Sequence, residues 1–245
     1  MRLRSACRAA TLAALVLAVP VAPVAAQDWG QQERWCGGTD KVAVDLQIGA
    51  CTALIQSGRY DNAGLAIIFI NRGFAYDSKG QYDRAIQDYD QAIRLKPDDA
   101  SAFYNRGNAY SNKRQYDRAI QDYDQAIRLK PDDADALNNR CYARATVNQL
   151  ETALADCNRS LALRPNDAAM LDSRAFTYLK MGRLDAALAD YNAALRIDPK
   201  YALALYGRGI AYRRKGDEAR AAADIAAALK IQPDIAGELA RRGVK

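Results

Sequence analysis

The feature that most constrains this chain is the even spacing of five prolines, each 34 residues after the last. A fixed period of this length indicates one supersecondary unit copied along the chain, with each unit burying its apolar face against its neighbours. With each proline at position 32, five units follow one another at 66–99, 100–133, 134–167, 168–201 and 202–235. Such a chain presents a repeated surface in place of a single globular core, so we expect any binding site to lie along that surface. The prolines are Pro97, Pro131, Pro165, Pro199 and Pro233.

Within the units, small and large residues recur at fixed positions. Position 20 is alanine in every unit and position 8 is small, whereas positions 4 and 24 are mostly large. Small residues at a fixed phase let helix backbones approach, so they mark helix crossings. Gly80, Gly182 and Gly216 predict a break between helix A and helix B, and the corner at 97–99 predicts the end of helix B and a cap for the next helix A. We therefore expect an all-α, right-handed solenoid with the A helices on its concave side.

The pattern resembles the tetratricopeptide repeat over about 170 residues. The family signature has a large residue at position 4, a small one at 8, Tyr at 11, Ala at 20, an aromatic residue at 24, Ala at 27 and Pro at 32. The first two units meet this signature in full, and the third departs from it with Cys141, Arg144 and Cys157 at positions 8, 11 and 24. The resemblance implies five helix-turn-helix units, and similar chains occur among secreted or periplasmic bacterial proteins.

The first residues are typical of a cleaved secretory signal. Arginines at 2, 4 and 8 precede an apolar run at 9–19, and small residues follow at 24–26. The run is too short to cross a bilayer, which takes about 20 helical residues. Cys7 precedes the run and therefore cannot be the lipidated cysteine of a lipoprotein signal. We expect a signal peptide at 1–26, no stable membrane insertion after its cleavage, and a periplasmic or secreted protein.

Two further segments flank the units. In the segment 27–65, the stretch 43–56 predicts one helix that packs as an N-terminal half-repeat. At the other end, Ile235 and Leu239 lie four residues apart and are followed by basic residues, which favour the C-terminal end of a helix. We therefore expect a short C-terminal cap at 236–245.

The charge of the chain does not predict a nucleic-acid binder. Once the three signal arginines are removed, 32 of the 35 basic residues remain against 29 acidic ones. This surplus is too small for a general polyanion-binding surface. From residue 202 onward there are nine basic and five acidic residues, so only the C-terminal end is basic.

Four cysteines follow the signal, and a periplasmic or secreted location permits disulfides. Cys141 and Cys157 occupy facing positions of one unit, and a bridge from Cys36 to Cys51 would tie the segment around Trp35 to the half-repeat. We predict both bridges, with buried thiols as the alternative. Neither pair has the CxxC spacing of a redox site, and the absence of histidine excludes zinc sites of the Cys/His type. We expect no metal and no cofactor.

The sequence predicts no catalysis. Without histidine, the chain lacks the commonest general base and the usual partner of a nucleophilic Ser or Cys. It also has no glycine-rich phosphate loop. Segments 81–100 and 115–134 are identical, so a duplication accounts for recurring acids such as Asp88 and Asp122. We expect most charged residues of these segments to lie on solvated helix faces.

The concave groove is expected at positions 2, 5, 6, 9, 12 and 13 of helix A, which the core does not require. Position 6 is asparagine in the first three units, and its amide can hold the backbone of an extended peptide; the alternative is a local packing preference. A basic cluster at the C-terminal end can capture an acidic segment or a terminal carboxylate, or consist of surface arginines only. The candidate groove residues are Asn71, Phe74, Tyr104, Asn105, Asn108, Asn138, Asn139, Tyr142, Tyr206, Arg213 and Arg214.

Some members of the family bind C-terminal carboxylates through a clamp of basic residues and asparagines. In this chain Asn108 and Asn139 fall in phase with that clamp. However, Tyr104, Ala169 and Ser173 stand where Lys, Lys and Arg would be needed. We therefore do not expect clamp binding.

The sequence predicts an exported, non-catalytic scaffold that binds a peptide or protein segment in the concave groove. Two alternatives remain open. One is a homo-oligomer that stacks end to end as a structural spacer. The other is a regulatory subunit of an envelope enzyme, such as one acting on cell-wall polymers.

Overall fold

The computed structural model describes residues 28–237. The expected signal peptide at 1–26 and residues 238–245 of the expected C-terminal cap lie outside the described residues. Between residues 28 and 237 the chain is helical and contains no strand. The helices that begin and end within these residues are α1 Trp29–Cys36, α2 Val44–Gln56, α3 Asn62–Ser78, α4 Tyr82–Leu95, α5 Ala100–Asn112, α6 Tyr116–Leu129, α7 Ala134–Thr146, α8 Leu150–Leu163, α9 Ala168–Lys180, α10 Leu184–Ile197, α11 Ala202–Arg214 and α12 Glu218–Ile231.

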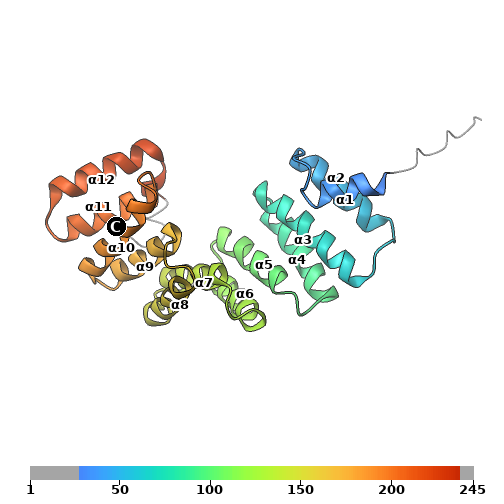
Figure 1. Cartoon of the computed structure of the whole chain (residues 1–245), viewed down its shortest axis with the longest axis horizontal. Helices are drawn as coiled ribbons and strands as arrows, with labels where there is room; N and C mark the ends of the chain where they lie inside the picture. The colour runs from blue at the N-terminus through green and yellow to red at the C-terminus, as the bar shows by residue number, and fades with distance from the viewer. Residues whose placement is uncertain (1–27, 238–245) are drawn as a thin grey trace, which may run out of the picture.

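The helices from α3 to α12 form the five predicted units, two helices to a unit. The two helices of each unit pack together, and each B helix also packs against the next A helix. Figure 1 shows the pairs following one another along an arc, with α1 and α2 at one end and α11 and α12 at the other. The predicted all-α solenoid is confirmed. Among the described helices, none combines the length and the apolar composition that a membrane span requires.

The turns follow from a few residues in each unit. Side chains of Asp61, Asp99, Asp133 and Asp167 accept hydrogen bonds from backbone amides in the first turn of α3, α5, α7 and α9, as expected of N-cap residues. Helix A ends in a left-handed residue, which is glycine in units 1, 4 and 5. In units 2 and 3 this conformation is adopted by Arg114, with φ 61°, and Asn148, with φ 68°.

The contact between the two helices of a unit depends on small residues that face large ones. The position-20 alanines, such as Ala85 and Ala119, are fully buried. Tyr123 of α6 is also buried and lies on the backbone of α5 at Gly107. Absence of a side chain at this glycine therefore allows the two helices to approach.

A methyl group at Gly107 is expected to lower the free energy of unfolding by about 1–3 kcal/mol. The new Cβ would lie 2.7 Å from Cε1 of Tyr123, whose buried ring would have to shift. Gly49, inside α2, is a matched control because a Cβ there meets nothing within 4 Å. Gly49→Ala is expected to stabilise the chain by roughly 0.5–1 kcal/mol. Urea unfolding of both variants tests this, and equal effects would contradict the packing account.

The N-terminal segment contains one helix more than the sequence analysis predicted. Helix α2 matches the predicted half-repeat helix, and the short helix α1 packs against it. Asp28 caps α1, and Trp29 and Trp35 pack against the buried pair Cys36 and Cys51. The irregular spacing of these residues, outside the 34-residue period, explains why α1 escaped the repeat pattern.

Both cysteine pairs are brought together as predicted from their positions. The Cα atoms of Cys36 and Cys51 lie 4.8 Å apart, and those of Cys141 and Cys157 lie 5.4 Å apart, with the sulfurs of each pair in contact. All four side chains are buried. The separations suit a disulfide in each pair.

The concave face is open in the first units and closed in the last ones. Phe74, at position 9 of unit 1, is 58% exposed, whereas Phe176, at the same position of unit 4, is 3% exposed. The reason is that α9 packs directly against both α7 and α11, which cover its concave side. The open part of the groove is therefore formed by α3, α5 and α7.

Candidate functional site

A row of buried ion pairs, here called the Arg–Asp ladder, lies behind the groove in all five units. In unit 2, Nε and Nη2 of Arg106 donate to the two carboxylate oxygens of Asp122 at 2.8 and 2.6 Å. The expectation that the acids of the duplicated segments are solvated is wrong for Asp88 and Asp122, each 4% exposed. The pairs are Arg72–Asp88, Arg106–Asp122, Arg140–Asp156, Arg174–Asp190 and Arg208–Asp224.

The same arginines link each unit to the one before it. Nη1 of Arg106 donates to Asp90 at 2.6 Å, and Nη1 of Arg140 donates to Asp124 at 2.7 Å. In units 4 and 5 the acceptors are the side-chain oxygens of asparagines 158 and 192. Each of these arginines therefore joins its A helix to two B helices, which holds neighbouring A helices at a set spacing.

In the open groove, a hollow of about 340 Å³ lies between α3, α5 and α7. We call it the amide hollow, because amide and hydroxyl side chains make up most of its wall. Its residues are Asp77, Asn108, Ser111, Asn112, Tyr123, Asn139 and Tyr142. Three of them, Asn108, Asn139 and Tyr142, are candidate groove residues from the sequence analysis.

Hydrogen bonds set the orientation of two amides in this hollow. The hydroxyl of Tyr123 donates to Oδ1 of Asn108 at 2.8 Å, and Nδ2 of Asn139 donates to the same oxygen at 2.9 Å. Nδ2 of Asn139 also donates to the hydroxyl of Tyr104 at 3.2 Å. The Tyr104 hydroxyl also interacts with the Asn108 amide, so Tyr104, Asn108, Tyr123 and Asn139 belong to one network. This network holds the Asn108 and Asn139 amides side by side in the wall of the hollow.

Both tyrosines of this network remain in the form that carries the hydroxyl proton. Burial raises the pKa of Tyr104, and it raises the pKa of Tyr123 still further. Ionisation of either ring would remove the proton and place a charge in the wall of the hollow. The amide orientation is therefore expected to be independent of pH across the neutral range.

The other predicted amides behave differently from this pair. Asn71 lies in a separate, mainly apolar hollow of about 220 Å³ at the N-terminal end of the groove, beside Ile67, which is 54% exposed. Asn105 and Asn138 are half-buried, and Oδ1 of Asn138 is buried with no hydrogen-bond partner among the described residues. The position-6 asparagines thus do not form one continuous row of ligand contacts.

The predicted basic end of the groove is separate from the amide hollow. Tyr206 packs against the C-terminal core. Nη1 of Arg214 donates to the carbonyl of Leu179 at 3.0 Å, at the end of α9. Arg213 is half-exposed and lies 3.9 Å from the carboxylate of Glu218. One of the two predicted arginines is therefore engaged in helix contacts.

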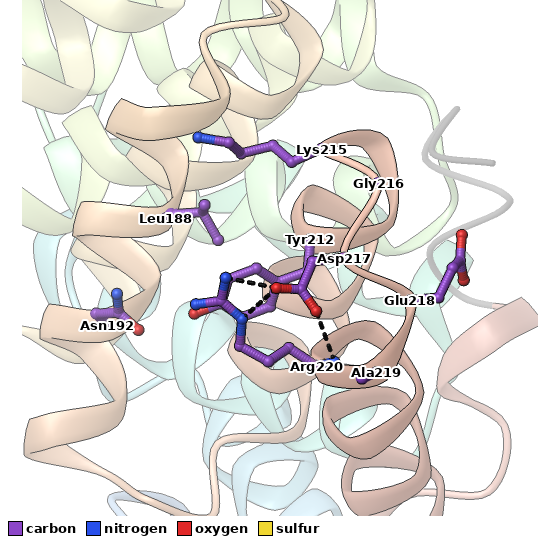
Figure 2. A pocket seen from close by; sticks show the side chains of 9 residues that line it. All are labelled: Leu188, Asn192, Tyr212, Lys215, Gly216, Asp217, Glu218, Ala219 and Arg220. Carbon is purple, nitrogen blue, oxygen red and sulfur yellow. Dashed lines mark hydrogen bonds and ion pairs between the residues drawn. The ribbon is translucent and has the colours of Figure 1, made fainter.

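A wider hollow of about 650 Å³ lies against α10, at the turn between α11 and α12. Figure 2 shows the guanidinium of Arg220 facing the carboxylate of Asp217, with Glu218 on the other side of the turn. Arg220 also covers the ring of Tyr212, 4.3 Å from its centre. Arg220 and Asp217 are thus paired with each other on an exposed surface. Neither charge at the centre of this hollow is left free for a ligand.

Sequence reasoning missed Asp77, Ser111, Asn112 and Tyr123 of the amide hollow. The first three occupy positions 12 and 13 of helix A, which are expected on the concave face. Tyr123 occupies position 24, one of the positions at which large residues recur. The ladder also had a signal, because Arg and Asp recur 16 residues apart in every unit. Within the described part of the chain, no cluster of His, Cys, Asp or Glu suits a metal ion.

Comparison with known proteins identifies the repeat. A TPR repeat model matches residues 73–114 and 177–216, and two tetratricopeptide repeat models match 100–133 and 202–235. No curated protein sequence matches the chain significantly. Among solved structures, YrrB, described as a TPR protein with an unusual peptide-binding site, is 29% identical over 76% of this chain and 93% of its own, with a TM-score of 0.58.

Two more distant structures share the fold. A tetratricopeptide repeat protein from Parabacteroides merdae is 19% identical over 80% of this chain and 77% of its own, with a TM-score of 0.69. MamA from Desulfovibrio magneticus is 21% identical over 69% of this chain and 96% of its own, with a TM-score of 0.60. The repeat matches, the signature residues and the stacked helix pairs agree, and the chain belongs to the tetratricopeptide-repeat family.

Proposed function

We propose that this protein is an exported, non-catalytic scaffold that binds an extended segment of a partner protein in the groove formed by α3, α5 and α7. The amide hollow carries the proposal. It is open, and hydrogen bonds to Tyr104 and Tyr123 fix its central amides before any ligand arrives. A preorganised site loses less entropy on binding than one whose side chains must first be ordered.

The Asn108 and Asn139 amides suit a peptide backbone. Nδ2 of Asn108 can donate to a peptide carbonyl, and Oδ1 of Asn139 can accept from a peptide N–H. Extended peptides present both groups, and exposed side chains such as Phe74 offer apolar contact beside them. The peptide-binding site described for YrrB gives this proposal support from a relative.

Two features support export of the protein, namely its N-terminal segment and its cysteine pairs. The N-terminal segment has the pattern of a secretory signal, and both cysteine pairs are in contact in the folded chain. Disulfides persist in oxidising compartments such as the periplasm. We therefore propose a periplasmic or secreted location, with both bridges formed there.

Photocrosslinking in cells tests the groove. Phe74 is replaced with p-benzoylphenylalanine, which keeps an aromatic ring at an exposed groove position, and Gln91, exposed on α4, carries the same group as the control. We expect one foreign protein to be attached from position 74 and to be absent from position 91, as read by mass spectrometry of the envelope fraction.

Other results would favour the alternatives. A crosslink from position 74 to a second copy of this chain alone would point to the end-to-end spacer. Capture of an envelope enzyme, followed by a change of its activity on addition of the purified chain, would identify a regulatory subunit. Equal crosslinking from both positions would contradict the groove proposal.

A further inference from the structure

Asp77 differs from the five aspartates of the Arg–Asp ladder. The five aspartates of the Arg–Asp ladder each receive two hydrogen bonds from an arginine. Asp77 is half-buried and accepts a hydrogen bond from the neutral amide of Asn112, at 3.3 Å. Burial raises the pKa of Asp77, with only this hydrogen bond opposing it. The folded chain thus encloses a carboxylate without supplying a counter-charge from the described residues.

The nearby cations are engaged elsewhere. Lys79, which follows α3, pairs with Asp45, and Lys113, which follows α5, pairs with Asp83. The arginines of α3 and α5 belong to the ladder. The amide hollow itself is lined by one carboxylate together with amides and hydroxyls, and by no cationic side chain. Its wall therefore favours a positively charged ligand.

A buried hydroxyl close to Asp77 lacks a hydrogen-bond partner. The hydroxyl of Tyr89 is buried and makes no hydrogen bond to any residue between 28 and 237. Burial raises the pKa of the Tyr89 hydroxyl, and the negative charge of Asp77 raises it further. In unit 2 the equivalent Tyr123 donates to Asn108, but unit 1 has Phe74 at that position. Unit 1 thus leaves a buried hydroxyl without a hydrogen-bond partner close to an acid that has no counter-charge among the described residues.

We propose, resting on the groove function above, that the amide hollow receives a lysine or arginine side chain of the bound segment, with its charged group beside Asp77. The ammonium or guanidinium group donates to the Asp77 carboxylate and to neighbouring oxygens such as Ser111 Oγ and Asn139 Oδ1. Charge-assisted hydrogen bonds of this kind are stronger than neutral ones. Phe74 lies one helical turn before Asp77 and is exposed, so it can cover the methylene groups of the basic side chain or an apolar neighbour.

A selection with blocked peptides tests the proposal. The probe is a bead library of random octapeptides that are acetylated and amidated, so that a basic side chain is the one source of positive charge. The purified chain, Asp77→Asn and Asp117→Asn are each panned against it. Asp117 is an exposed carboxylate on α6, outside the groove, so its variant controls for net charge.

We expect the chain and Asp117→Asn to enrich peptides with Lys or Arg at one position, and Asp77→Asn to lose this preference. A selected peptide is then compared with its analogue carrying norleucine in place of lysine. The native chain is expected to bind the lysine peptide at least about tenfold more tightly than the norleucine peptide. Asp77→Asn is expected to bind both peptides alike.

The outcomes separate this inference from the groove function. Peptides enriched without any basic preference, or a preference that survives in Asp77→Asn, would overturn the inference and leave the groove function standing. If the native chain retains no peptide, the groove function fails as well. Loss of binding through misfolding is checked by thermal unfolding of Asp77→Asn at pH 7.

This variant is not expected to unfold more easily. The folded chain raises the pKa of Asp77 above its unfolded value, so the folded state favours the protonated acid. The ionised form therefore costs stability, and that cost appears as the pH rises through the raised pKa and is absent at lower pH. Asparagine carries no charge at any pH, so Asp77→Asn is expected to match or exceed the native melting temperature at pH 7.

Discussion

Asp122→Ala is expected to lower the free energy of unfolding by about 3–5 kcal/mol. The carboxylate of Asp122 holds two donors of Arg106, and its removal leaves a partly buried guanidinium with Asp90 as its remaining acidic partner. Burial alone would lower the pKa of Arg106, but the hydrogen bonds and charges of Asp122 and Asp90 outweigh it and raise the pKa. Arginine stays protonated in proteins, so Arg106 cannot escape the penalty by losing its proton when Asp122 is removed.

Urea unfolding followed by circular dichroism measures this effect. Gln121→Ala is the matched control, because Gln121 is the exposed neighbour of Asp122 on the same helix, and we expect a change within about 0.5 kcal/mol. The double variant Arg106→Met/Asp122→Leu removes both charges and is expected to be more stable than Asp122→Ala alone. If Asp122→Ala behaves like the control, the ladder does not set the spacing of the A helices.

The fold could be predicted from the sequence because its determinants are local and repeated. The prolines, the position-20 alanines and the corner aspartates each act within one unit, and the copies reinforce one another. The ladder was missed for the opposite reason. An aspartate such as Asp88 looks like a solvated charge when its helix is read alone, and its burial becomes evident only when Arg72 is considered 16 residues earlier.

The groove was predictable in outline and not in detail. The concave positions of helix A were identified, and Asn108 and Asn139 do meet in one hollow. The enclosure of Asp77 depends on how closely α3, α5 and α7 approach, and the engagement of Arg214 depends on the approach of α9 and α11. These spacings arise from curvature accumulated over several units, which the composition of one unit does not specify.

Removal of the Cys141–Cys157 bridge is also expected to destabilise the folded chain strongly. Cys141→Ala/Cys157→Ala should lower the free energy of unfolding of the oxidised chain by about 3 kcal/mol, because a bridge across 16 residues restricts the unfolded state. The position in the fold gives this bridge a further role. Units 1 and 2 pack a tyrosine on a glycine at these two positions, as with Tyr123 on Gly107, and unit 3 has the two cysteines instead.

The bridge therefore replaces the Gly–Tyr contact in the unit at the middle of the arc, where α7 supplies Asn139 to the amide hollow. Because each repeat is stabilised mainly by its neighbours, loosening unit 3 should weaken the coupling between units 2 and 4. Thermal unfolding of the native chain with and without dithiothreitol, beside the double alanine variant, tests this. If reductant leaves the native melting temperature unchanged while Ellman titration finds free thiols, Cys141 and Cys157 act as buried thiols and the bridge carries no stability.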